Sequence, residues 1–343
     1  MRSQSLSNRE CCILVLLTDE LKQWIGREFN YAAPEELGRA SIRYFALAIG
    51  DDNKLYFDDA YARSAGYAGV IAPPTFVCET NQYAHRQPNA DGYIGHSWEL
   101  PLTGCRMIRG GHEYEFFQPV VPDDRLRVSW RLEDISEHSS SRGGSMLIAI
   151  ALATFSNHRG EMLARNRETL IFQPLETGNR KDSERAPGPA QTLQSEEQKN
   201  EELLAPHTSR ELQVGMPTPT LRRTLDLVRM IAYAGATWDW ARLHYDPAYV
   251  AERRLPGPVI DGQMLGALLS ETLIEWLGPR AFVRKLNFRL RAMVFAGDTV
   301  RCEGQVTALT TEGTHRFVSV AQRVAVGDRL VADGSAAVRL PRL

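Results

Sequence analysis

The stretch AYAGATWD, residues 232–239, decides the fold, because it lies over YFALAIGD, residues 44–51, when the chain is compared with itself at a shift of 188 positions. The same shift needs no gap and pairs further residues: Asp58 with Asp246, Tyr61 with Tyr249, Gly69 with Gly257 and Ile71 with Val259. A second block repeats at a shift of 174: Tyr114 with Phe288, Val120 with Val294, Asp124 with Asp298 and Leu126 with Val300. Two blocks repeated in the same order predict two copies of one fold.

A polar segment separates the two copies. Residues 176–207 are charged and interrupted by proline and glycine, and their few apolar residues show no sustained period. We therefore expect an N-terminal extension over 1–17, a first domain over 18–175, a linker over 176–208 and a second domain over 209–343, which are ordinary domain sizes within 343 residues.

Each copy reads as a short helical stretch, a Pro/Gly corner, a long apolar helix and then strands. In the second copy the helix covers roughly 262–277, with apolar residues at helical spacing. Short turns separate four expected strands in each copy, which favours an antiparallel sheet. The strands are expected at 111–118, 125–133, 145–156 and 161–172, and at 284–290, 298–309, 315–326 and 329–340. The predicted class is α+β, with one long helix against each curved sheet.

Composition excludes several classes of protein. The 40 Lys and Arg residues nearly balance 42 Asp and Glu residues, so a nucleic acid or an anionic membrane is not expected as the main partner. The five cysteines have neither disulfide-scaffold nor metal-ligand spacing, which predicts reduced thiols and a cytoplasmic protein. The apolar run 11–17 is too short for a membrane span and lacks a signal-peptide cleavage site, and Thr18 is the expected cap of the first helix.

An Asp and a His five residues apart carry the chemistry. Asp239 and His244 stand at a break between two regular elements, where a loop can turn both side chains into one cavity. Addition of water to an activated double bond needs one group that takes a proton from water and another that delivers a proton to carbon. The spacing alone is weak evidence, because most such pairs lie on protein surfaces.

The surrounding residues resemble the MaoC-like hydratase/dehydratase family, whose motif reads roughly G-D-x-N-P-I-H-x-D. Asp239, Leu243, His244 and Asp246 fit it, and PGPVIDG at 256–262 resembles the later P-G-x-I-x-H-G segment. The first half resembles the companion FAS1-like dehydratase domain in its residues 44–56, 69–76 and 114–119. The resemblance implies a double hot-dog fold of the kind found in enoyl-CoA hydratase 2 and mesaconyl-CoA hydratase.

The resemblance also implies roles for residues. Asp239 and His244 would activate the catalytic water, and the backbone N–H of Gly262 would polarise the thioester carbonyl as an oxyanion hole. We expect further substrate-binding residues around them: Tyr233, Trp238, Val259 and Arg289. Arg289 belongs to a basic group near a strand that suits the phosphates of coenzyme A, although such groups are more often a solvated face.

The chain departs from the motif at several places. Trp238 replaces the Gly before the Asp, Ala241 the Asn, Arg242 the Pro and Asp261 the His. Loss of the Asn would leave the Asp–His pair less well oriented. The first copy keeps Asp51 and Asn53 but has Tyr56 in the His position, so we expect it to be non-catalytic, with Asp51 and Asn53 as loop caps.

We therefore expect a hydro-lyase acting on an enoyl or 3-hydroxyacyl thioester of coenzyme A or an acyl carrier protein, with no cofactor and no metal. Two alternatives stay open: a hot-dog thioesterase, in which an Asp-activated water attacks the thioester carbonyl, and a non-catalytic acyl-binding subunit. A homodimer is possible, although the duplication already supplies one hot-dog pair.

Overall fold

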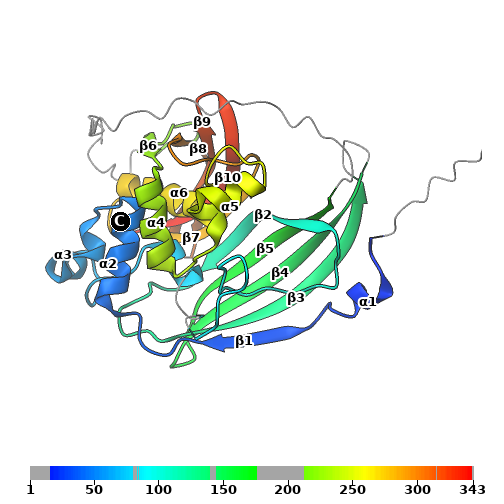
Figure 1. Ribbon diagram of the computed structural model, residues 1–343. Helices are drawn as coiled ribbons and strands as arrows, with labels where there is room; N and C mark the ends of the chain where they lie inside the picture. The colour runs from blue at the N-terminus through cyan, green and yellow to red at the C-terminus, as the bar shows by residue number, and fades with distance from the viewer. Residues whose placement is uncertain are drawn as a thin grey trace, which may run out of the picture.

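The computed structural model describes residues 16–79, 83, 85–139, 144–175, 212–313 and 315–341. Its described strands form one antiparallel sheet of ten strands in the order β1-β3-β4-β5-β2-β7-β10-β9-β8-β6 (Figure 1). The linker expected at 176–208 lies outside the described residues. None of the described helices combines the length and apolar character that crossing a membrane requires.

The order of elements repeats from one half to the other. The first half contains β1 (Glu28–Ala32), α2 (Gly38–Ile49), η1 (Lys54–Tyr56), α3 (Asp59–Ser64), η2 (Pro74–Cys78), β2 (Cys105–Phe116), β3 (Leu126–Ser139), β4 (Ser145–Asn157) and β5 (Met162–Pro174). The second contains β6 (Leu221–Thr224), α4 (Leu227–Thr237), η4 (Arg242–His244), α5 (Pro247–Glu252), α6 (Gly262–Leu277), β7 (Phe282–Leu290), β8 (Thr299–Glu312), β9 (His315–Val326) and β10 (Arg329–Leu340). This correspondence confirms the duplication and the α+β double hot-dog class.

The two halves meet at strands β2 and β7. Glu113 pairs with Asn287 in that ladder, and these two residues correspond to each other at the shift of 174. The centre of the ten-stranded sheet is therefore an approximate twofold axis between the copies. A continuous ladder joins the halves more firmly than side-chain packing alone, because every strand edge at the junction is hydrogen-bonded.

The long central helix is present in the second half but absent from the described residues of the first. Helix α6 is almost wholly buried and lies against β7–β10 (Figure 1). At the corresponding place the described part of the first half has only η2, a 3-10 helix of five residues. Our expectation of a long helix in each half is thus wrong here. The segment after η2 is interrupted by Pro88 and Gly92 and has no continuous apolar face, so it cannot extend a buried helix.

Two short edge strands are absent from the sequence-based prediction. Strand β1 pairs with β3, and β6 pairs with β8. Both are too short and too polar for a clear alternating pattern. The expected helix cap is confirmed, because the Thr18 side chain accepts a hydrogen bond from the backbone of Leu21 in α1 (Asp19–Lys22).

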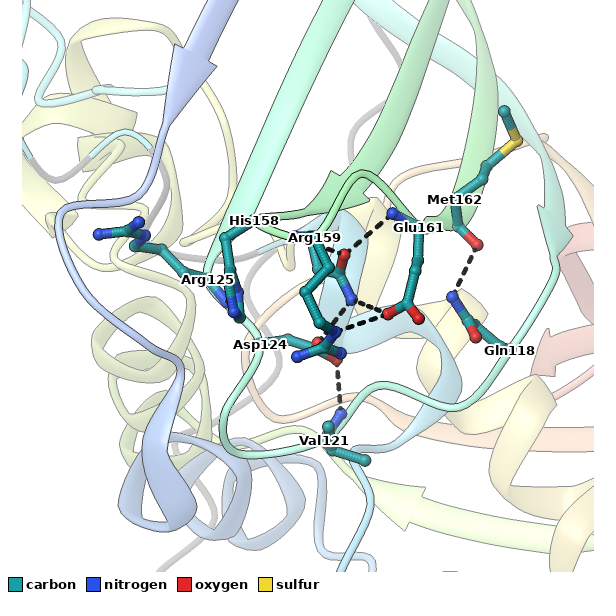
Figure 2. A network of polar contacts seen from close by, with 9 residues as sticks. Gln118, Val121, Asp124, Arg125, His158, Arg159, Glu161 and Met162 are labelled. Atoms are coloured by element: carbon teal, nitrogen blue, oxygen red, sulfur yellow. Dashed lines mark hydrogen bonds and ion pairs between the residues drawn. The ribbon is translucent and has the colours of Figure 1, made fainter.

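The duplicated Asp124 and Asp298 have a structural role. Asp124 is buried, accepts hydrogen bonds from Val121 N–H at 3.0 Å and Asn157 Nδ2 at 2.9 Å, and forms an ion pair with Arg159 (Figure 2). Asp298 likewise accepts a hydrogen bond from the backbone N–H of Phe295, also at 3.0 Å. Each carboxylate fixes the turn that leads into the third strand of its half, which explains why both copies keep it.

Candidate active site

The loop between α4 and α5 holds the Asp side chain. Helix α4 ends at Trp238, which has a left-handed backbone with φ of 58°. The Asp239 carboxylate accepts a hydrogen bond from the backbone N–H of Ala241 at 3.0 Å. This bond orients Asp239 without the Asn that the family motif places at position 241.

The backbone of Val259 fixes the imidazole of His244. The distance from His244 Nδ1 to the Val259 carbonyl oxygen is 2.7 Å. A carbonyl oxygen only accepts hydrogen bonds, so Nδ1 carries the proton and the neutral ring keeps Nε2 as a proton acceptor. Val259 therefore acts at this site through its backbone.

The start of α6 brings a second carboxylate to the pair. Asp261 caps the helix by accepting a hydrogen bond from Gln263 N–H at 3.0 Å. One carboxylate oxygen of Asp239, one of Asp261 and one ring nitrogen of His244 all lie within 4.8 Å of one another. Two carboxylates and an imidazole at this separation can share protons, and the same donor set could also hold a divalent cation.

Gly262 is the first residue of this helix. A Cβ at its position would lie 2.5 Å from a terminal methyl group of Leu290, so a larger residue would require that side chain to move. Among the described residues no acceptor takes the Gly262 N–H, as is usual for the first turn of a helix. This N–H and the helix dipole favour negative charge on a group bound there.

The two carboxylates have different acidities. Burial raises the pKa of Asp239, and the negative charge of Asp261 raises it further. Burial would also raise the pKa of Asp261, but its electrostatic interactions with His244 and Arg109 outweigh burial, so the pKa of Asp261 lies below its usual value. The pKa of Asp239 is thus shifted upward and that of Asp261 downward, so Asp239 is the better proton donor of the two carboxyl groups.

The sheet of the first half contributes an arginine to this site. Arg109 on β2 forms an ion pair with Glu168 at 2.9 Å and lies 3.7 Å from Asp261. Its guanidinium also donates to Gln263 Oε1 at 2.8 Å and to the hydroxyl of Tyr93 at 3.0 Å. Arg109 thus links the first half to the residues that begin α6.

A cavity of about 510 Å³ lies between the Asp–His loop and this sheet. It is lined by Cys78, Glu79, Tyr83, Tyr93, Ile94, Gly95, Arg109, Trp130, Asn166, Glu168, Thr237, Trp238, Asp239, Asp261 and Gln263. It occupies the side of the first-half sheet on which the described chain has no long helix.

The structure brings together most of the residues that the sequence predicted for the site. Trp238 lines the large cavity, and Tyr233 lines a smaller one of about 240 Å³ that also contains Asp239 and His244. Arg289 is different, because it is exposed on β7 opposite Asp333 and outside both cavities. The structure does not bring Arg289 to the Asp–His pair.

Arg242, in the place of the motif Pro, makes a contact that proline cannot make. Its backbone N–H donates to the Asp91 carbonyl at 2.8 Å, and its side chain forms an ion pair with Asp246, also at 2.8 Å. Asp91 in turn accepts a hydrogen bond from the Tyr249 hydroxyl. These bonds fasten the first-half loop around Asp91 to the catalytic loop.

Sequence analysis missed the charged residues of the first-half sheet. Asn166 and Glu168 alternate with exposed arginines on β5, in a row of inward positions that also holds Ala164 and Leu170. Polar residues at positions where a strand should be apolar are a signal of a functional or strained site. Without the fold, nothing indicated that this row faces Asp261.

Comparison with known proteins places the two halves of the chain in related families. A model of the FAS1-like dehydratase domain region matches residues 23–166, and a model of the MaoC-like domain matches residues 211–328. A UPF0336 protein from Streptomyces avermitilis is 38% identical over 114 residues, which cover 33% of this chain and 72% of that protein. A probable enoyl-CoA hydratase alpha subunit from Thermomonospora curvata is 27% identical over 166 residues, which cover 46% of this chain and 52% of that protein.

A solved structure described as a MaoC-like dehydratase superposes with a TM-score of 0.70 at 19% identity and covers 94% of this chain and 100% of that one. At this identity the likeness concerns the fold, and it spans both halves. The fold and the two domain models define a double hot-dog protein. The chain belongs to the MaoC-like dehydratase family and carries a FAS1-like dehydratase region as its first half.

Proposed function

We propose that this protein is a hydro-lyase that adds water to, or removes it from, an acyl thioester carried by coenzyme A or an acyl carrier protein. The observation that carries the proposal is the meeting of Asp239 and His244 within 4.8 Å beside the start of α6. Membership of the MaoC-like dehydratase family supports a hydratase or dehydratase.

In the hydration direction, a water molecule lies between the two side chains. Nε2 of His244 takes a proton from this water, because Nδ1 is already committed to Val259. The hydroxide adds to C3 of the enoyl thioester, and Asp239, whose pKa is raised by burial, delivers a proton to C2. Dehydration runs through the same steps in reverse.

The start of α6 stabilises the charge that develops during this reaction. Electrons from the double bond move onto the thioester oxygen, and the N–H of Gly262 donates to that oxygen. Substitution of Gly262 would place a side chain against Leu290 beside this N–H. The acyl group occupies the large cavity, with Trp238 at its wall.

The test measures loss of enoyl-thioester absorbance on short, long and branched enoyl-CoA substrates and on an enoyl carrier protein. Asp239→Asn and His244→Ala should each lower kcat about 10²–10⁴-fold. Asp51→Asn, at the equivalent position of the first half, is the matched control and should keep the rate.

Product analysis separates the rival functions. A hydro-lyase gives the hydroxyacyl thioester, whereas a thioesterase releases free thiol. Binding of thioester without either product would support a non-catalytic subunit. A chelator should leave the rate unchanged; loss of activity with EDTA and recovery with a divalent metal would show that the Asp239–His244–Asp261 set holds a metal instead. Activity that survives both substitutions would refute the proposed site.

A further inference from the structure

A second cavity lies in the first half, at the place that corresponds to the active site. Tyr56 lines it in the position of His244, and Pro73 and Pro74 line it in the positions of Asp261 and Gly262. Proline has no N–H, so Pro74 cannot stabilise an oxyanion as Gly262 can. The cavity thus keeps the location of a thioester site but lacks its reactive groups.

The cavity is partly open to solvent, with about 460 Å³ of space between its lining residues and the solvent outside. It is lined by Leu55, Tyr56, Tyr67, Ile71, Ala72, Pro73, Pro74, Phe116, Gln118, Pro119, Val120, Ile274, Ala281, Phe282 and Val283. No charged side chain is among these residues, in contrast to the active-site cavity, which is lined by four carboxylates and Arg109. Its walls are therefore suited to a hydrocarbon chain.

Three arginines gather beside this apolar lining. Arg339 and Arg284 lie 5.0 and 5.9 Å from the ring of Phe282, and Arg284 and Arg165 lie 5.4 and 5.6 Å from the ring of Phe117. Arg339 is also close enough to Tyr67 to counteract the effect of burial on the pKa of that residue.

These arginines keep donors for an anion, although one guanidinium nitrogen of Arg284 already donates to the backbone carbonyls of Phe116 and Phe117. Within the described part of the chain, no carboxylate lies at ion-pair distance from Arg165, Arg284 or Arg339, and the nearby Glu115 pairs with Lys285 at 3.9 Å. Burial lowers the pKa of Arg284, and the repulsion from Arg339 lowers it further. A bound anion would relieve this repulsion, because carboxylates form strong hydrogen bonds with guanidinium groups.

Gln118 completes the polar rim. Its amide nitrogen donates to the Met162 carbonyl at 3.2 Å, which ties the loop after β2 to the start of β5 (Figure 2). This hydrogen bond helps to fix the part of the cavity wall that Gln118 forms.

We propose that this first-half cavity is a second, non-catalytic binding site, which takes the hydrocarbon chain of a fatty carboxylate and holds its head group at Arg339 and Arg284. The inference does not rest on the proposed reaction, because it concerns binding and uses none of the active-site residues. It gives the first half a ligand of its own, beyond shaping the active site.

The test uses octanoate as the probe and the full chain as the protein. Calorimetry measures its affinity, and hydrogen exchange measured by mass spectrometry locates it. Octanoate should protect residues 66–78 and 116–121. The double variant Arg284→Gln/Arg339→Gln should weaken binding about tenfold or more, since it removes charged donors at the head group. Arg131→Gln, an exposed arginine on β3, is the matched control and should leave the affinity unchanged.

A second variant fills the cavity instead of changing its charge. Ala281→Leu should reduce octanoate binding, while 1-octanol, which has no anionic head, should bind the Arg variant as well as it binds the wild-type protein. No binding at all, protection confined to residues 237–244, or an octanoate affinity indifferent to both arginines would overturn the proposal.

Discussion

The loop 51–56 of the first half and the loop 239–244 of the second share their backbone and differ in their chemistry. Asp51 and Asp239 each accept a hydrogen bond, at 3.0 Å, from the backbone N–H two residues later. Asp58 and Asp246 cap the following helices in the same way. The duplicated aspartates therefore share the structural role of holding backbone N–H groups. The activity proposed for the second loop depends on the other residues around Asp239.

The surfaces that face these loops differ more than the loops do. Arg109, His112, Asn166 and Glu168 of the first-half sheet correspond in strand register to Val283, Leu286, Gly334 and Ala336 of the second. A bulge at Gly110 has its counterpart at Arg284, so the register agrees throughout. The second half supplies the reactive loop and the first half supplies the charged wall opposite it. Duplication has thus divided one site between two copies.

The largest expected effect comes from making the second loop resemble the first. His244→Tyr should lower kcat for thioester hydration about 10²–10⁴-fold, because a tyrosine is a poor proton acceptor near neutral pH. The reciprocal change, Tyr56→His, should create no second activity, since Pro74 offers no N–H to the thioester. Steady-state rates for both variants test the comparison; a gain of activity in His244→Tyr/Tyr56→His would contradict it.

The second prediction replaces Arg109 of the first-half sheet with valine, the residue at the corresponding position of the second-half sheet. Arg109→Val leaves Glu168 and Asp261 buried without their cation and should lower the free energy of unfolding by about 3–5 kcal/mol. Arg109→Val/Glu168→Ala should recover part of that loss, because one uncompensated charge is removed with its partner. Urea unfolding measures both, and a single variant as stable as the wild type would show that the ion pair is dispensable.

The third prediction concerns Asp51, the buried aspartate of the first loop. Burial raises the pKa of Asp51 to about 7, so between about pH 4 and 7 the folded protein keeps a proton that the unfolded chain has released. This group therefore makes stability fall as pH rises through that window. Asp51→Asn should reduce this pH-dependent decline in the free energy of unfolding by up to about 4 kcal/mol.

Urea unfolding at pH 5 and pH 8 measures this effect. Asp58→Asn is the control, because Asp58 is exposed and the asparagine retains its cap. If the free energy of unfolding changes equally between pH 5 and pH 8 in the wild type and in Asp51→Asn, Asp51 does not hold its proton in the folded protein.

The smallest effect is expected at the end of the helix before each loop. Gly50 and Trp238 both have left-handed backbone, with φ of 81° and 58°. Trp238→Gly should raise stability by about 1 kcal/mol, because a residue with a side chain is strained there. Gly50→Ala should do the opposite, since its Cβ would collide with the guanidinium groups of Arg223 and Arg229. Melting temperatures of both variants provide the measurement.

Much of the fold was predictable because it is encoded in repeated local signals. The internal repeat, the strands after each helix and helix α6 depend on period and turn residues, which the sequence displays directly. The interruption of the first-half helix was missed, because the repeat predicted equal elements in both copies. The edge strands β1 and β6 were missed because they form through pairing with distant strands.

The sequence by itself determined the duplication, the fold class and the Asp239–His244 pair, since each depends on residues close together in the chain or repeated at a fixed shift. Only the tertiary structure decided which residues face that pair. Arg109 and Glu168 reach Asp261 from strands of the other half, and Val259 fixes His244 through a carbonyl that any residue would carry. Long-range contacts and backbone groups leave no local pattern, so the wall of the site becomes visible only when the chain is folded.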